Sequence, residues 1–97
     1  MSTYIMLANY TDQGIRNVKE SPKRADAARD LAKKCGAEMT ALYLTIGSHD
    51  LVALIEAPGD EAVAKFALKL GSLGNVRTTT LKAFNEREYR TIVETLP

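Results

Sequence analysis

The sequence has very few of the residues that support redox, metal or covalent chemistry. It contains one cysteine, one histidine and no tryptophan among 97 residues. A single cysteine rules out a disulfide within the chain and is typical of a reducing compartment, so we expect a cytoplasmic protein. One histidine, one distant cysteine and no paired carboxylates do not make a metal-ligand set. We therefore expect neither a metal nor an organic cofactor.

Long apolar runs and an excess of one charge are also missing. No apolar run approaches the roughly 20 residues that span a bilayer, and the start of the chain lacks the basic region and cleavage site of a signal peptide. Thirteen basic and twelve acidic residues give a net charge of +1. This balance does not mark a nucleic-acid or anionic-membrane binder, so we expect neither partner.

What the sequence does contain is a regular alternation of strand-like and helix-like segments within one domain, residues 1–97. The expected strands are Thr3–Tyr10, Ala37–Ile46, Asp50–Ala57 and Val76–Phe84. The expected helices follow Thr11–Asp12, Ser21–Pro22, Asp60–Glu61 and Asn85. This order predicts an α+β, ferredoxin-like βαββαβ fold with a C-terminal helix. We expect a four-stranded antiparallel sheet in the order 4-1-3-2, with both long helices on one face.

The other face of that sheet has no helix to cover it. We expect it to carry one alternating set of side chains, namely Tyr4, Met6, Ala8, Met39, Ala41, Tyr43, Val52, Leu54 and Glu56. For the last strand the pattern leaves open whether Val76, Thr78 and Thr80 or Arg77, Thr79 and Leu81 belong to this face. Such an apolar face needs a cover. A second copy is the cover that we favour, so we predict a homo-oligomer, at least a dimer, that encloses a cavity.

The turn between the second and third strands holds the only side chain that titrates near neutral pH. Residues 47–50 read Gly-Ser-His-Asp, a spacing typical of a hairpin. His49 could act as a general base or ligand at the mouth of a cavity, or it could be a turn residue with its ring in solvent. Asp50 is expected to bind turn amides through its carboxylate.

Four other side chains are candidates for ligand binding. Tyr4 and Tyr43 would offer hydroxyls to an enclosed space, although both fit a core or interface role as well. Glu56 lies near the end of an apolar strand, where a carboxylate needs a partner. Arg77 on the last strand is the partner we expect, in a pair that is structural rather than catalytic.

The segment Leu44–Asp50 resembles the hairpin of GYD-domain proteins, a family named for a Gly-Tyr-Asp signature. The resemblance covers nearly the whole chain. Its other matching segments are Tyr10–Ile15, Val18–Lys19, Ser21–Pro22, Glu56–Pro58 and Gly74–Phe84. It implies a ferredoxin-like fold in a dimeric α/β barrel, and no activity is established for the family as a whole. This chain departs from the signature because His49 stands in the tyrosine position, with Ser48 between it and Gly47.

Two functions from different classes follow. The first is a non-catalytic oligomeric module that binds a small ligand or a partner in a cavity formed by the sheet face. The alternative is a small cofactor-independent enzyme, monooxygenase- or isomerase-like, which only fold-level analogy supports. The enzyme interpretation is favoured if Tyr4, Tyr43, His49 and Glu56 line one pocket, and disfavoured if they are scattered.

Overall fold

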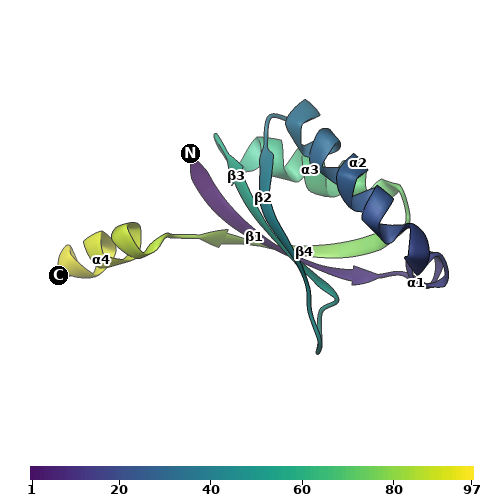
Figure 1. Ribbon diagram of the computed structural model, residues 1–97. Coiled ribbons are helices and arrows are strands. Elements are labelled where there is room, and N and C mark those ends of the chain that lie inside the picture. Colours follow the sequence, from purple (N-terminus) through teal and green to yellow (C-terminus); the bar gives the residue numbers. More distant parts are fainter.

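A computed structural model describes all residues of the chain, 1–97. The strands are β1 (Ser2–Tyr10), β2 (Glu38–Leu44), β3 (Leu51–Ala57) and β4 (Val76–Ala83). The helices are α1 (Asp12–Arg16), the 3₁₀ turn η1 (Val18–Glu20), α2 (Ser21–Lys34), α3 (Asp60–Ser72) and α4 (Glu86–Glu94). The strands form one antiparallel sheet in the order β2-β3-β1-β4. This is the predicted order, and α2 and α3 lie together on one side of the sheet (Figure 1).

Local sequence signals account for several helix ends. Thr11 caps α1 by accepting a hydrogen bond from the amide of Gly14, and Pro22 lies in the first turn of α2, where its missing amide hydrogen has no helical partner. Gly36 follows α2 with φ +88°, as expected for a left-handed cap. Asn85 and Glu88 form a capping box at the start of α4.

The core lies between the sheet and the two long helices. Phe66 of α3 and Ile55 of β3 are its largest fully buried side chains. The remaining members of this cluster are Tyr4, Met6, Ala32, Ala37, Met39, Ala53, Ala57 and Val63. Alanines account for four of its ten residues, which leaves a thin core for a chain of this length. None of the helices has both the length and the hydropathy to cross a bilayer.

The prediction of which side chains face away from the helices was wrong for β1. Tyr4, Met6 and Ala8 are buried on the helix side, so Thr3, Ile5, Leu7 and Asn9 take the other side. The alternation was correct, but both sets include apolar residues, and the pattern alone does not say which set the helices cover.

The prediction that Met39 faces away from the helices was also wrong. The predicted side was correct for Ala41 and Tyr43 of β2 and for the residues of β3. Met39 is buried opposite Ile55. The register shifts between Met39 and Ala41, so an irregularity in the strand moves Ala41 and Tyr43 to the helix-free side. There they pair with Leu54 and Val52. The alternation of apolar and polar residues in the sequence does not predict a bulge of this kind.

The register of β4 decides the question that the sequence left open. Arg77, Thr79 and Leu81 pair with Asn9, Leu7 and Ile5 of β1, so they share the helix-free side. We call this side the open face. Its members are Thr3, Ile5, Leu7, Asn9, Glu38, Ala41, Tyr43, Val52, Leu54, Glu56, Arg77, Thr79, Leu81 and Ala83.

Candidate functional site

The open face has an apolar centre and charged ends. Ile5, Leu7, Val52 and Leu54 occupy its middle and are only half-buried, with no element of the chain packed over them. Leu81 beside them is 46% exposed. A flat apolar surface of this kind, bordered by polar side chains, is typical of an interface rather than of a surface that stays in water.

The charges on the open face are arranged with one sign at each end. Glu56 pairs in register with Glu38 on one side and with Thr3 on the other, and Thr3 donates a hydrogen bond to Glu56 through its hydroxyl at 2.8 Å. Arg77 pairs with Asn9, six residues farther along β1 than Thr3. At about 3.4 Å per residue, six residues separate the acidic and basic ends by roughly 20 Å.

The expected pair between Glu56 and Arg77 is therefore absent within the chain. The strand register places the two residues at opposite ends of the sheet, and Glu56 has the Thr3 hydroxyl as its hydrogen-bond partner instead. Arg77 is exposed and belongs to none of the four ion pairs of the chain. Glu38, which sequence reasoning missed, gains its place beside Glu56 only through the β2–β3 register.

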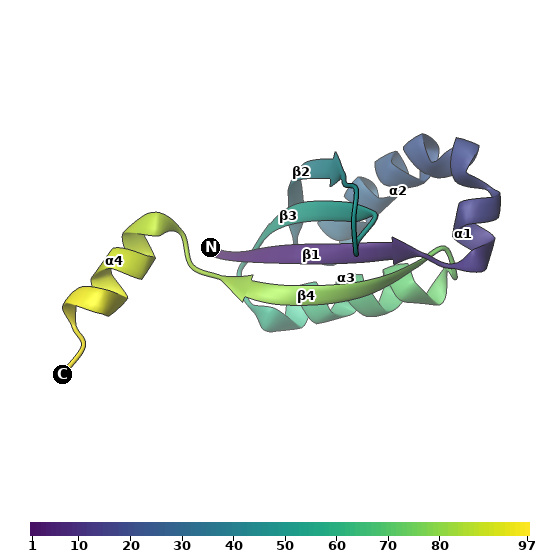
Figure 2. The same cartoon turned by 90° about the horizontal axis from the view of Figure 1, so that it is seen from below.

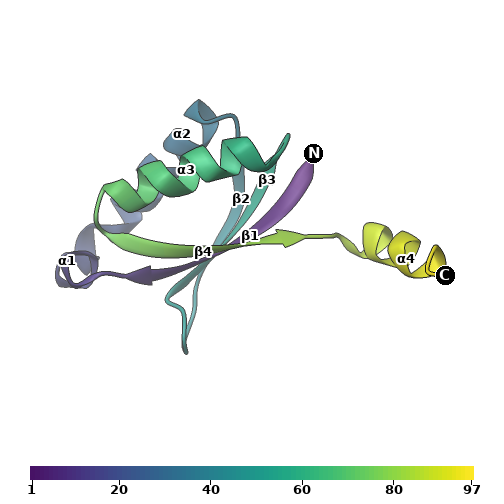
Figure 3. The same ribbon diagram turned by 180° about the vertical axis from the view of Figure 1, so that it is seen from behind.

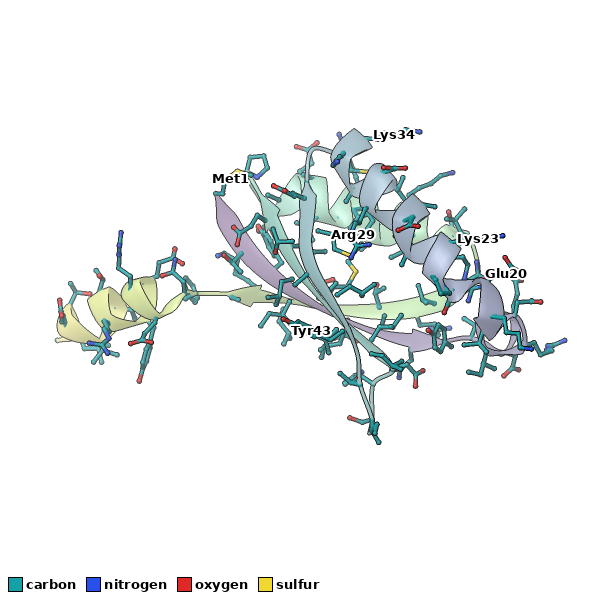
Figure 4. The ribbon with its side chains drawn as sticks, in the orientation of Figure 1. Met1, Glu20, Lys23, Arg29, Lys34 and Tyr43 are labelled. Carbon is teal, nitrogen blue, oxygen red and sulfur yellow. The ribbon has the colours of Figure 1, made fainter.

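Tyr4 is a core residue and lies on the opposite side of the sheet from Tyr43. Its side chain is buried, and its hydroxyl donates a hydrogen bond to the carboxylate of Asp60 in the first turn of α3. That hydrogen bond, together with burial and the Asp60 charge, raises the pKa of the Tyr4 phenol. Tyr43 is 57% exposed on the open face, on the side of the sheet away from α2 and α3 (Figure 4).

His49 lies in a loop longer than predicted. The β2–β3 pairing stops at Leu44 and Leu51, and the loop between them is closed by a hydrogen bond from the Thr45 amide to the Asp50 carbonyl at 2.8 Å. His49 contributes its backbone carbonyl, which accepts a hydrogen bond from the Thr45 hydroxyl at 2.6 Å. The loop extends away from α2 and α3 (Figures 1 and 3), and Ile46 within it is fully exposed.

Asp50 ties this loop to the end of β1. Its carboxylate accepts a hydrogen bond from the Tyr10 amide at 2.9 Å, and its amide donates to the Ala8 carbonyl at 3.0 Å. The expectation that Asp50 binds amides of its own turn was wrong, since the amide is supplied by the neighbouring strand. Asp50 thus holds the hairpin in place and is not oriented toward the His49 ring by any hydrogen bond.

These positions do not form one pocket. Tyr4 lies in the core, Tyr43 and Glu56 lie on the open face, and His49 lies in the projecting loop. The convergence that would have favoured the enzyme interpretation is missing. No group of three or more histidine, cysteine, aspartate or glutamate side chains is placed to hold a metal ion.

The C-terminal helix is the second unpartnered apolar surface. α4 extends beyond the end of the sheet and away from the other helices (Figure 2), and none of its residues is buried. Tyr89, Ile92 and Val93 are 44–60% exposed on one side of it, and Leu96, two residues beyond its end, is 65% exposed. An isolated helix of nine residues is marginal in water, so its apolar side is expected to pack against another molecule.

Comparisons with known proteins agree with this architecture. A curated relative is 34% identical over 84 residues, which cover 86% of this chain and 88% of the relative, and is named "Glutamine synthetase and cystathionine beta-lyase binding protein", from Thermus thermophilus. The crystal structure of TTHA0845, also from Thermus thermophilus, superimposes with a TM-score of 0.58 and 25% identity, covering 88% of this chain and 95% of that one. The family model of the GYD domain matches residues 4–93, so the chain belongs to the GYD domain family.

Proposed function

We propose that this protein is a non-catalytic protein-binding module that works as a homodimer. In this proposal the open face of one copy packs against the open face of the other, and α4 of each copy contacts a protein partner. The observation that carries the proposal is the large apolar surface that the isolated chain leaves exposed on the open face and on α4.

The size of that surface supports a second copy. A compact monomer of this mass exposes about 5,500 Å², whereas this chain exposes 6706 Å². The radius of gyration, 14.5 Å, likewise exceeds the roughly 13 Å typical of a compact domain this size. The excess surface is about 1,200 Å² per chain and includes α4 as well as the open face. A dimer through the open faces would therefore bury up to about 2,400 Å² in total, and an interface above roughly 1,200 Å² counts as specific.

The charge pattern supports a face-to-face arrangement of two copies. Glu38 and Glu56 lie near the β2 edge at one end of the open face, and Arg77 lies on the β4 edge at the other end. A two-fold axis in the plane of the interface, running diagonally across the sheets, brings Arg77 of each copy over the acidic end of the other. The strands then cross at a steep angle, as in orthogonal sheet packing. The Arg77–Glu56 pair would form between copies instead of within one.

A charge in the middle of the open face should break the dimer. We expect Leu54→Asp to convert the protein to a monomer at micromolar concentration, because an unpaired carboxylate would be buried at the centre of the interface. Leu68→Asp is the matched control, since Leu68 is 76% exposed on α3. Light scattering coupled to size exclusion measures the mass. A monomeric wild type, or a dimeric Leu54→Asp variant, would refute the arrangement.

The name of the Thermus relative gives two enzymes that it binds, and this supports protein partners for the present chain. We propose enzymes of the same two classes, glutamine synthetase and cystathionine beta-lyase, as partners of this chain. Tyr89, Ile92 and Val93 of α4 have the i, i+3, i+4 spacing by which an amphipathic helix fits an apolar groove, and Leu96 follows at i+7, just beyond the end of the helix. A dimer would present two such helices.

Partner binding should depend on the apolar side of α4. We expect Ile92→Asp to weaken binding to the purified enzymes by about 30-fold or more, which is the effect of removing a central anchor residue. Thr91→Asp adds the same charge to the polar side of α4 and should leave affinity unchanged. Biolayer interferometry with each enzyme, and with an unrelated oligomeric enzyme as reference, gives the affinities. Equal losses in the two variants would contradict the role of α4, as would a monomeric Ile92→Asp variant.

A further inference from the structure

A cleft lies on the opposite side of the sheet from the open face. It has a volume of about 460 Å³ and lies between α2, α3 and the sheet. Of the 21 residues that line it, 16 are hydrophobic. Small-molecule sites in proteins are typically apolar clefts of roughly 300–1,000 Å³ with a few polar groups. The size and composition of this cleft are within that range.

The cleft exists because α2 carries small side chains where a core helix usually carries large ones. Ala25 and Ala28 line it from α2, and Met6, Ala53 and Phe66 line it from the sheet and α3. Of the residues in α2 only Ala32 is buried. Close packing would fill such a space with leucine or isoleucine. The layer between α2 and the sheet is therefore underpacked at the end where β1 finishes.

The charged residues that line the cleft are Arg24 and Lys69, and both are cationic. Arg24 is held in place because its guanidinium donates hydrogen bonds to the carbonyls of Asn17 and Gly14 at 2.9 and 3.1 Å. Lys69 belongs to no ion pair, whereas Lys65 on the same helix pairs with Glu61 at 3.7 Å. An apolar cleft with positive charge and no negative charge complements one chemical class, an anion with an apolar body.

We propose that this cleft binds an amphiphilic carboxylate, with the hydrocarbon part against α2 and the sheet and the carboxylate at Lys69 and Arg24. The site is separate from the open face and from α4, so it does not depend on the proposed dimer or on the protein partners. Tyr10, Ser21 and Asn75 also line the cleft and add polar groups for the headgroup. A ligand there would replace the side chains that α2 lacks and would stabilise the fold.

The test uses decanoate as the probe and decyltrimethylammonium as its matched cation. We expect calorimetric titration of the full chain to give one decanoate per chain, with binding of decyltrimethylammonium at least about tenfold weaker. Lys69→Gln should weaken decanoate binding several-fold, and Lys65→Gln should not. Ala28→Leu should abolish binding by filling the cleft, while Ala64→Leu on the exposed side of α3 should leave it intact. Circular dichroism establishes that each variant is folded.

Three results would overturn this proposal. Equal binding of the anion and the cation would show an unspecific apolar surface. Decanoate binding that survives both Lys69→Gln and Ala28→Leu would place the ligand elsewhere. Binding that appears only in the Ile92→Asp variant would show that α4 of a second copy fills the cleft in the wild type.

Discussion

Gly14→Ala is expected to cost roughly 3 kcal/mol of unfolding free energy, because the added methyl group overpacks a junction that hydrogen bonds hold closed and would weaken those bonds. A Cβ at this position would lie 2.0 Å from the backbone carbonyl oxygen of Asn75. The same junction is closed by Thr11, whose amide donates to the Asn75 carbonyl at 3.1 Å and whose hydroxyl donates to the Gly74 carbonyl at 2.6 Å. Relief of the clash would stretch both contacts.

Gly71 provides the matched control for this prediction. It lies near the end of α3, and an added Cβ there would meet nothing within 4 Å. Gly71→Ala should therefore be neutral or stabilise the protein by up to about 1 kcal/mol, as alanine does in helices. Urea unfolding measured by circular dichroism gives both values. A Gly14→Ala variant within about 0.5 kcal/mol of the wild type would mean that the junction moves apart freely.

Phe66→Ala is expected to have an effect at least as large. Phe66 is 1% exposed at the centre of the core, and truncation of a buried phenylalanine costs about 3–5 kcal/mol. Because small domains have only about 5–15 kcal/mol of stability in total, the variant should melt at least about 10 °C below the wild type.

The control for Phe66→Ala lies two residues along the same helix. Leu68 is 76% exposed, so Leu68→Ala should change stability by no more than about 0.5 kcal/mol. Scanning calorimetry at fixed protein concentration measures both, since a dimer would make the melting temperature depend on concentration. Similar melting temperatures for the two variants would indicate that the Phe66 side chain does not contribute more to core packing than the exposed Leu68 side chain.

The two sides of the sheet offer two different surfaces for binding. The open face is apolar with an acidic and a basic end, a pattern that complements a second copy of itself. The helix side holds a cleft whose charged lining residues are Arg24 and Lys69. The residues first singled out for catalysis or ligand binding are divided among the core, the open face and the β2–β3 loop. This separation favours binding functions over a single catalytic centre.

Local and periodic signals in the sequence were sufficient for the order of elements and the strand order. Gly36 and Asn85 mark helix ends through backbone conformation and capping, which depend on neighbouring residues alone. The alternation in β3 correctly assigned Val52, Leu54 and Glu56 to the helix-free side. The sequence was also sufficient to identify the family, because the hairpin and the segment Gly74–Phe84 resemble the corresponding segments of GYD-domain proteins.

Contacts between segments distant in the sequence decided which side chains face the helices, which charged residues lie together and where the cleft forms. In β1 both alternating sets include apolar residues, and Tyr4 is buried because its set packs in the core with residues of α3 such as Phe66. Its hydroxyl bonds to Asp60, 56 residues away in the sequence. The bulge in β2 depends on pairing with β3, and it places Met39 on the opposite side of the sheet from Ala41 and Tyr43 without a local signal in the sequence. Glu56 and Arg77 are separated by register, and the cleft arises where α2 meets the sheet. The amino-acid pattern of a segment determines whether it forms a helix or a strand, while tertiary packing determines which other segments contact each of its faces.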